Sequence, residues 1–275
     1  MLLITGANGQ LGNELRLLLG DNALYTDYAE QDIANAAEGR ACVNAHRGDM
    51  IVNCAAYTAV DKAESDEEKA YAINAVGPAN LAQAGVPLIH VSTDYVFDGA
   101  SCRPYVEDDV PNPATVYGRT KLAGEKHVLE NADTALVIRT AWLYSSFGNN
   151  FVKTMLRLGA ERDSLNVVFD QVGTPTYARD LAAAIVKIMP QLKPGMKGVY
   201  HFSDEGVCSW YDFAVRIMDK AGQPCRVKPI ESVDYPTPAK RPFYSVLNKG
   251  KIKAAFGVDI PHWEKSLDDC LKKLL

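Results

Sequence analysis

Three glycines at a three-residue spacing follow the first apolar run of the chain. Residues 2–5 have the pattern of a buried strand, and Gly6, Gly9 and Gly12 stand where that strand would turn into a helix from about residue 10. Gly6 permits a tight turn, Gly9 lets backbone N–H groups approach a pyrophosphate, and Gly12 lets the helix pack closely on the strand. In this context the glycines predict a dinucleotide-binding fold, the alternative being a plain glycine-rich turn.

Short apolar runs alternate with helical patterns over the first half of the chain. The apolar runs are residues 2–5, 23–26, 50–55, 87–92 and 135–139, and the helical patterns are residues 10–19, 66–84 and 116–130. Continuous apolar runs are typical of strands covered on both faces, and the spacing leaves room for helical crossovers. The pattern predicts an α/β fold with a doubly wound parallel sheet of the Rossmann type.

This regular alternation ends near residue 145. A helix is expected at 177–189 and a late strand at 198–202 that returns to the main sheet, while residues 193–244 are rich in proline and glycine. Such segments turn over the surface of a protein. We therefore expect a dinucleotide-binding domain of residues 1–145 with 173–200, and a smaller C-terminal substrate-binding lobe of residues 146–172 with 201–275.

Composition excludes several classes of partner. The chain has 275 residues, a formal charge of −5 and a pI near 5.6, so it has no global basic field for nucleic acid or an anionic membrane. No apolar stretch approaches the ~20 residues of a membrane helix, and residues 2–5 run directly into the glycine turn without the pattern of a secretory signal. We expect a cytoplasmic protein.

The cysteines and histidines do not have the spacing of a metal site or a disulfide framework. Six cysteines are scattered without a C-x-x-C pair, and five histidines show no H-x-x-x-H pair. We expect reduced thiols and metal-free chemistry. Cys54 lies in an apolar run, where a small buried residue is expected and not a nucleophile.

A tyrosine and a lysine four residues apart are the strongest catalytic signal. Tyr117 and Lys121 share a face of the helix predicted at 116–130, so an ammonium can lie near a phenol. Lowering the pKa of a tyrosine from about 10 to about 7 needs roughly 4 kcal/mol. One charge at about 4 Å in an effective dielectric of about 20 supplies that much. The pair predicts an acidic phenol that donates a proton to a carbonyl, although such pairs also arise by chance on exposed helices.

Acidic and small residues after the later strands extend the predicted nucleotide site. Asp27 ends the second strand, where a carboxylate accepts hydrogen bonds from the adenosine ribose and repels a 2′-phosphate. This favours NADH over NADPH without excluding NADPH, because a nearby side chain can accommodate phosphate. Asp32 and Ile33 are expected beside the adenine, and Ala56, Tyr57 and Thr58 beside the ribose and nicotinamide.

Together these motifs resemble those of the extended short-chain dehydrogenase/reductases. The motifs are T-G-x-x-G-x-x-G at 5–12, S-T-D-Y-V-F-D-G at 92–99 and Y-x-x-x-K at 117–121. Within that superfamily the chain is similar to the dTDP-4-dehydrorhamnose reductases over nearly its whole length. The supporting stretches are residues 52–64, 139–144, 149–155, 170–176, 241–242 and 245–247.

The resemblance implies a role for each motif residue. Tyr117 would be the proton donor, and Lys121 would lower its pKa and bind the nicotinamide ribose. Thr93 would hold the substrate carbonyl with Asp94 beside it. Trp142 would pack against a nucleotide-sugar substrate, the alternative being an ordinary core or interlobe aromatic. The cofactor, NADPH or NADH, would be lined by Gly6, Gly9, Gln10, Leu11, Gly12, Asp27, Asp32, Ile33, Ala56, Tyr57, Thr58, Val91, Tyr117 and Lys121.

The same resemblance bears on metals and assembly. Some members of the family hold magnesium between subunits with glutamates, and Glu14 matches one such position, but Arg179 stands where a second acid is expected. We therefore expect no metal-bridged dimer, and a monomer or homodimer without metal. Arg241 suits either a substrate diphosphate or a surface ion pair.

Two other functions remain open at this stage. Nucleotide-sugar dehydratases and epimerases of the superfamily usually carry Thr-Asp-Glu, whereas Tyr95 follows Thr93 and Asp94 here, which favours simple reduction. A non-catalytic regulatory subunit resembling the methionine adenosyltransferase beta subunit is the second alternative. The presence of Thr93, Tyr117 and Lys121 argues against it.

Overall fold

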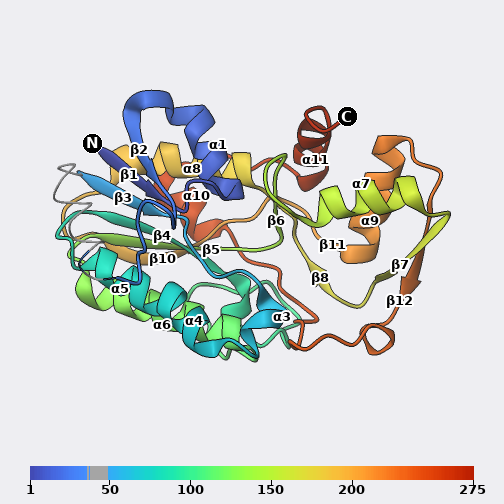
Figure 1. The fold of residues 1–275 in the computed structure, drawn as a ribbon, viewed down its shortest axis with the longest axis horizontal. Helices are drawn as coiled ribbons and strands as arrows, with labels where there is room; N and C mark the ends of the chain where they lie inside the picture. The colour runs from blue at the N-terminus through green and yellow to red at the C-terminus, as the bar shows by residue number, and fades with distance from the viewer. Residues whose placement is uncertain (36, 38–48) are drawn as a thin grey trace.

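Six parallel strands form the main sheet of the computed structural model, which describes residues 1–35, 37 and 49–275. Their order is β10-β5-β4-β3-β1-β2 (Figure 1). The strands are β1 (Leu2–Thr5), β2 (Ala23–Thr26), β3 (Met50–Asn53), β4 (Leu88–Thr93), β5 (Ala135–Thr140) and β10 (Lys197–His201). The predicted Rossmann-type α/β fold is confirmed, and the late strand returns to the main sheet beside β5.

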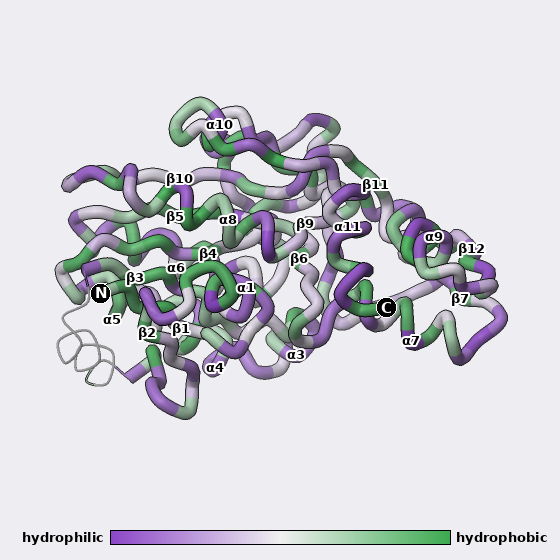
Figure 2. The backbone as a smooth tube through the Cα atoms, turned by 90° about the horizontal axis from the view of Figure 1, so that it is seen from above, coloured by the Kyte–Doolittle hydropathy of each residue, from purple (hydrophilic) through white to green (hydrophobic). Residues whose placement is uncertain are grey.

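Helices cover both faces of this sheet. On one face, Ile4, Val52 and Ile89 share a core with α1 (Gln10–Leu19), α8 (Ala178–Ile188) and α10 (Gly250–Phe256). Their strand neighbours Leu3, Ile51 and Leu88 share the opposite core with α5 (Gly77–Ala82) and α6 (Val116–Asn131). Because side chains alternate along a strand, burial on both faces requires apolar residues at consecutive positions. The hydrophobic residues of the central strands appear in green in Figure 2.

A smaller lobe has its own core. It contains α7 (Phe151–Glu161), α9 (Trp210–Ala221) and α11 (Trp263–Leu271), with β7 (Ser164–Val168) parallel to β12 (Arg226–Ile230). Short strands complete it: β8 (Val172–Gly173) pairs with β11 (Cys208–Ser209), and β6 (Leu143–Tyr144) pairs with β9 (Thr176–Tyr177). Phe213, Ile217 and Leu267 are fully buried there. The smaller lobe was predicted to consist of residues 146–172 with 201–275. That range contains α10, but in the structure α10 packs on the main sheet and not in the core of the smaller lobe.

The helix predicted at 66–84 is interrupted. After α3 (Val60–Ala63), the chain forms α4 (Glu67–Tyr71), a π-helical turn η2 (Ala72–Val76) and then α5. The π turn carries Asn74, which is fully buried and uses its side chain on the preceding loop. Its Oδ1 accepts the N–H of Tyr57 at 2.8 Å, and its Nδ2 donates to the Tyr57 carbonyl at 3.1 Å. A π-helical turn inside a helix is frequent at functional sites.

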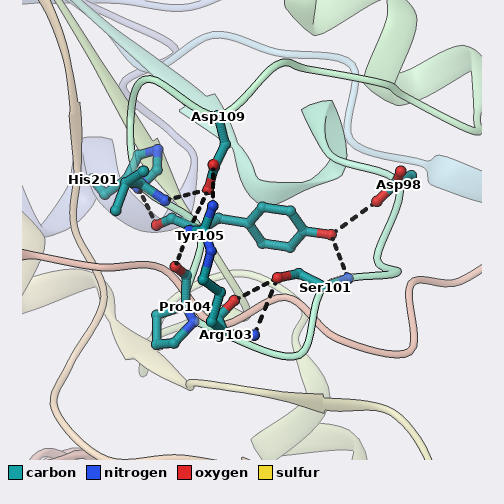
Figure 3. A network of polar contacts seen from close by, with 8 residues as sticks. Asp98, Ser101, Arg103, Pro104, Tyr105, Asp109 and His201 are labelled. Atoms are coloured by element: carbon teal, nitrogen blue, oxygen red, sulfur yellow. Dashed lines mark hydrogen bonds and ion pairs between the residues drawn. The ribbon is translucent and has the colours of Figure 1, made fainter.

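The connection from β4 to α6 is anchored to β10. After the 3-10 turn η3 (Asp94–Val96), Tyr105 donates its hydroxyl to Asp98 at 2.9 Å, and its carbonyl lies 3.1 Å from Nδ1 of the buried His201 (Figure 3). Arg103 binds Asp109 at 2.6 Å in the same network. Burial lowers the pKa of His201 to about 3, so the ring is neutral. The network ties the loop of residues 98–109 to β10.

Among the described residues, five cysteines are free thiols: Cys54, Cys102, Cys208, Cys225 and Cys270. Cys42 and His46 lie outside the described residues.

In the part of the chain that is described, no helix has both the length and the apolar composition needed to cross a bilayer. Three short turns complete the fold: η1 (Gly20–Asn22), η4 (Met189–Gln191) and η5 (Ser232–Asp234).

Candidate active site

A cavity of about 950 Å³ opens at the carboxyl ends of the main strands. Its walls come from the loops after β1, β2, β3, β4 and β5, from the first two turns of α6, and from the start of α9 in the smaller lobe. Ligands of open α/β sheets bind at this edge, where strand order reverses. The cavity is therefore the candidate site.

Two of the three N-terminal glycines are required by close backbone contacts. Gly6 has φ of +67°, and a Cβ there would lie 2.5 Å from the backbone nitrogen of Ala55. A Cβ on Gly12 would lie 2.5 Å from the Cα of Ala7. Gly9 is different, since its closest neighbour would be the Gly6 carbonyl at 3.2 Å and it faces the cavity. Its missing side chain leaves room beside the N-terminus of α1, where a phosphate group is favoured.

The carboxylate after β2 is oriented by this loop. Asp27 is half-buried in the cavity wall, and its Oδ2 accepts the N–H of Asn8 at 2.8 Å while Oδ1 accepts the N–H of Tyr28 at 2.8 Å. A carboxylate oxygen has further lone pairs for a ribose hydroxyl. The structure thus places Asp27 where the glycine turn and β2 meet.

Most of the predicted cofactor residues meet in this cavity. Its lining includes Gly6, Gly9, Gln10, Leu11, Gly12, Asp27, Asp32, Ile33, Ala56, Thr58, Val91, Tyr117 and Lys121. Tyr57 is not among the lining residues. Asn74 binds its backbone, and its hydroxyl donates to Asp66 at 3.1 Å, on the side of α4. This set fits a dinucleotide, because it combines a phosphate-sized gap, a ribose acceptor and small residues for the rings.

The predicted catalytic residues converge from β4 and α6. Thr93 ends β4 and donates its hydroxyl to Asp94 at 2.9 Å, and it is near enough to the phenol of Tyr117 to act on the pKa of that group. Thr115 caps α6 by accepting the N–H of Gly118 at 3.0 Å. A Cβ on Gly118 would lie only 2.2 Å from the carbonyl of Tyr95, so glycine lets α6 approach η3 closely enough to set this geometry.

Burial shifts the pKa of the Tyr117 phenol in the direction opposite to the predicted one. Desolvation raises the pKa of Tyr117, with the neighbouring Asp94 adding to it, so the expectation of a pKa near 7 is wrong for this structure. Lys121 is not among the groups that act on this pKa, and its Nζ donates to the carbonyl of Val91 at 2.7 Å. Burial lowers the pKa of Lys121 itself to about 8. The phenol is therefore protonated at neutral pH, the form that a proton donor needs.

Asp94 is a buried acid beside this pair. Burial raises the pKa of Asp94 to about 6, opposed by the hydrogen bond from the Thr93 hydroxyl and by the nearby hydroxyl of Ser245. Cys54 also lines the cavity, and burial raises its pKa to about 12, so it is a thiol and not a nucleophile.

Trp142 lies in the cavity wall in a strained conformation. Its φ of +48° is the only positive value among the described non-glycine residues. Its ring stacks on Trp210, with centroids 3.6 Å apart and planes 10° apart, and both rings line the cavity. A non-glycine residue in the left-handed region costs about 1–3 kcal/mol and is typical of ligand sites.

Comparison with known proteins identifies the family. The family model described as "RmlD substrate binding domain" matches residues 1–275. The chain belongs to this family. A dTDP-4-dehydrorhamnose reductase of Aggregatibacter actinomycetemcomitans is 43% identical to it, over 97% of this chain and 96% of that protein.

Solved structures of other members have the same fold. A dTDP-4-dehydrorhamnose reductase of Clostridium acetobutylicum is 44% identical, with a TM-score of 0.95 and 99% of both chains covered. The Bacillus anthracis dTDP-4-dehydrorhamnose reductase, solved in complex with NADP, is 39% identical, with a TM-score of 0.95 over 99% of this chain and 98% of that chain. The fold of this RmlD family member is thus shared over its full length.

Trp210 is one of several cavity residues that the sequence prediction missed. Trp210 begins α9 in the smaller lobe, directly after Ser209, which forms a capping box with Asp212. The pattern Ser-x-x-Asp is a sequence signal for a helix start. That signal could have located the helix, but not its position against Trp142, which is distant in sequence.

Glu14, which matches a metal-holding position of some family members, has cations around it in this RmlD family member. Glu14 is fully buried, and its Oε1 accepts the hydroxyl of Ser145 at 2.6 Å. Its Oε2 lies 3.8 Å from Nη1 of Arg179 and 3.8 Å from Nζ of Lys273. The described residues contain no cluster of three potential metal ligands. Two positive side chains at one carboxylate do not fit a divalent cation there.

Arg241 makes protein contacts. It forms an ion pair with Asp61 at 2.5 Å and donates to the hydroxyl of Tyr95 at 3.0 Å, and it is not among the cavity-lining residues. Of its two predicted roles, the structure favours the ion pair. Through these two contacts Arg241 holds the segment before Tyr244 against α3, which carries Asp61, and η3, which carries Tyr95.

Proposed function

We propose that this protein reduces the C4 ketone of dTDP-4-dehydro-L-rhamnose to dTDP-L-rhamnose, with NADPH or NADH as reductant, in the synthesis of a cell-surface polysaccharide precursor. The observation that carries the proposal is the shared wall of one cavity. The glycine turn and Asp27 lie at one part of it, and Thr93, Tyr117 and Lys121 at another. The names of full-length relatives support the sugar.

In this mechanism the chain's residues hold and protonate the ketone. The cofactor, held by the glycine turn, Asp27 and Lys121, supplies the hydride. Thr93, whose single hydroxyl proton goes to Asp94 in the structure, would turn that hydroxyl to donate a hydrogen bond to the C4 oxygen. The neutral phenol of Tyr117 would give that oxygen its proton as negative charge develops. Hydrogen bonds that strengthen as charge grows stabilise the transition state more than the ground-state ketone. Asp94 and Trp142 position the sugar.

Replacing Tyr117→Phe tests the proton donor. We expect kcat to fall by about 10²–10⁴-fold, because a general acid contributes that much, while NADPH and NADH still bind. Tyr144→Phe is the matched control. It removes a buried hydroxyl that lies outside the cavity and has no hydrogen-bond partner among the described residues, so kcat should stay near the parent value. The measurement is loss of reduced-cofactor absorbance with dTDP-4-dehydro-L-rhamnose, with the sugar product identified.

The same assay separates the two alternative functions. A dehydratase or epimerase would recycle its cofactor without net consumption. Its second acid has no counterpart here, since the residue after Asp94 is Tyr95, whose hydroxyl accepts a hydrogen bond from Arg241. A regulatory subunit would turn over no keto-sugar and would co-purify with a catalytic partner. The proposal further places the enzyme in the cytoplasm, as a monomer or homodimer.

A further inference from the structure

A buried histidine lies between the nucleotide loop and Lys121. His90 is on β4 and is 0% exposed. Its Nδ1 is 3.0 Å from Nδ2 of Asn53 at the end of β3, and its Nε2 is 3.5 Å from Nζ of Lys121. Burial, with the nearby Lys121 charge adding to it, holds the pKa of His90 well below its usual range, so the ring is neutral.

The tautomer of this ring is fixed by Asn53. The Oδ1 of Asn53 accepts the N–H of Ala55 at 3.0 Å and the hydroxyl of Thr5 at 2.7 Å. A backbone N–H only donates, so the amide oxygen must face it and the Nδ2 group must face His90. Nδ1 of His90 then accepts, and in a neutral imidazole the proton is on Nε2.

The Nε2–H of His90 therefore points at Lys121. An ammonium has three donors and no acceptor, whereas an uncharged amine has a lone pair. Nζ already donates to the carbonyl of Val91 at 2.7 Å. An N–H directed at the same nitrogen is repelled by the ammonium and accepted by the amine. Because Nδ1 of His90 accepts a hydrogen bond from Asn53, that nitrogen is not free to take up a proton. His90 therefore acts as a fixed dipole and not as a proton relay.

The other charged or titratable groups around Lys121 are few. Glu125, one turn further along α6, favours the ammonium, but its carboxylate is shared with Arg139 of β5 at 2.7 Å and with Ser92 at 2.5 Å. Cys54, after β3, is a neutral thiol. Tyr117 on α6 is a neutral phenol. The dipole of His90 on β4 is thus the polar group that acts against the ammonium.

We propose that His90 is a positioning residue, whose Nε2–H holds the Lys121 amine against the Val91 carbonyl and favours the uncharged amine over the ammonium. Its meaning for catalysis rests on the proposed function, because Lys121 would bind the cofactor ribose beside Tyr117. Lys121 then exchanges a proton near neutral pH, which an ordinary lysine does not do.

Titration of Lys121 by NMR tests this without cofactor or substrate. The whole protein is labelled with ¹³C at lysine Cε, and the Lys121 signal is assigned by its loss in Lys121→Arg. In the parent, Lys121 should titrate near pH 8. In His90→Gln, which has similar volume and can turn its carbonyl toward Nζ, the titration should move up by about 0.5–1 unit, the worth of one hydrogen bond.

Two further variants decide between a dipole and general loosening of the core. His90→Asn keeps an acceptor for Asn53 but removes the group facing Lys121, and it should also raise the midpoint. His201→Gln replaces another fully buried histidine, on β10, and should leave Lys121 unchanged. Unchanged midpoints in both His90 variants would overturn the proposal, as would an equal shift in His201→Gln or a parent midpoint above pH 10.

Kinetics give an independent measurement. If the ammonium is the form that binds the ribose, the alkaline limb of the kcat profile should move to higher pH in His90→Gln. A purely structural role would lower kcat at every pH without moving the limb. Since the NMR titration needs no turnover, it can fail while the reduction assay succeeds, and the reverse.

Discussion

Asp94 and Tyr117 lie on either side of the Thr93 hydroxyl, and burial acts on both acids. For Tyr117 burial maintains the proton that the proposed reaction needs. For Asp94 it has a cost, because the pKa of about 6 leaves a carboxylate that is 3% exposed ionised at neutral pH. A polar group that is unfavourable for stability is expected where function requires it.

Asp94→Asn should reveal this cost as a pH-dependent change in stability. The folded pKa of Asp94 lies above its unfolded value, so the folded state binds more protons between about pH 4 and 6, and stability falls as pH rises through that window. Asparagine resembles the protonated acid. We expect Asp94→Asn to be about 1–3 kcal/mol more stable than the parent at pH 7.5 and nearly equal at pH 4, measured by urea unfolding.

Asp109→Asn provides the opposite sign. The hydrogen bond from Arg103 holds the pKa of Asp109 below its usual range, so its stabilisation is present above the unfolded pKa and lost as pH falls through the folded value. Asp109→Asn should destabilise the protein at pH 7.5. An Asp94→Asn variant that is less stable than the parent at pH 7.5 would contradict the account of Asp94.

At the scale of elements, a glycine with positive φ stands near each end of α1. Gly6, in the turn before the helix, has φ of +67° and is pressed against the backbone of Ala55 after β3, whereas Gly20, the C-cap, has φ of +53° and open space around it. The two positions separate backbone strain from close approach. Gly6→Ala should combine both effects, and Gly20→Ala should show strain alone.

We expect Gly20→Ala to cost about 1–3 kcal/mol of unfolding free energy with unchanged cofactor affinity. Gly6→Ala should cost at least about 2 kcal/mol more, because backbone atoms of Ala55 cannot rotate away, and NADPH and NADH should bind more weakly. Urea unfolding and fluorescence titration of the cofactor measure the two effects. Equal stability losses in both variants would show that the turn after β1 moves away from β3.

Elements with strong local patterns were predictable. The glycine spacing at Gly6 and Gly12 and the uninterrupted apolar strands reflect contacts that constrain single positions, and both were confirmed in the fold. The π turn at Asn74 was not predictable, because it depends on where Tyr57 lies. The predicted pKa of Tyr117 was wrong for a related reason. The prediction assumed that the Lys121 ammonium faces the phenol, but Lys121 Nζ donates to the carbonyl of Val91, which lies on another element.

At the scale of the whole molecule, the cavity is shared by the two cores. The main sheet with β5 and the smaller lobe with α9 lie side by side (Figure 1). Trp142 follows β5, and Trp210 begins α9. Their stacking across the boundary orients a residue whose backbone is strained. Sequence patterns could not predict this pair, since its members are separated along the chain by much of the smaller lobe. The substrate half of the site therefore depends on how the two lobes pack.

Trp210→Ala should weaken nucleotide-sugar binding without affecting the cofactor. Loss of a stacked aromatic partner is worth about 0.5–1.5 kcal/mol, so KM for the sugar should rise roughly 3–10-fold, while the Kd of NADPH, bound at the glycine turn, stays unchanged. Trp263→Phe is the matched control, because Trp263 is buried in the same lobe but does not line the cavity. It should lower stability and leave KM unchanged. A Trp210→Ala enzyme with the parent KM for the sugar would place substrate recognition within the main sheet domain alone, since the smaller lobe would then contribute nothing to holding the sugar.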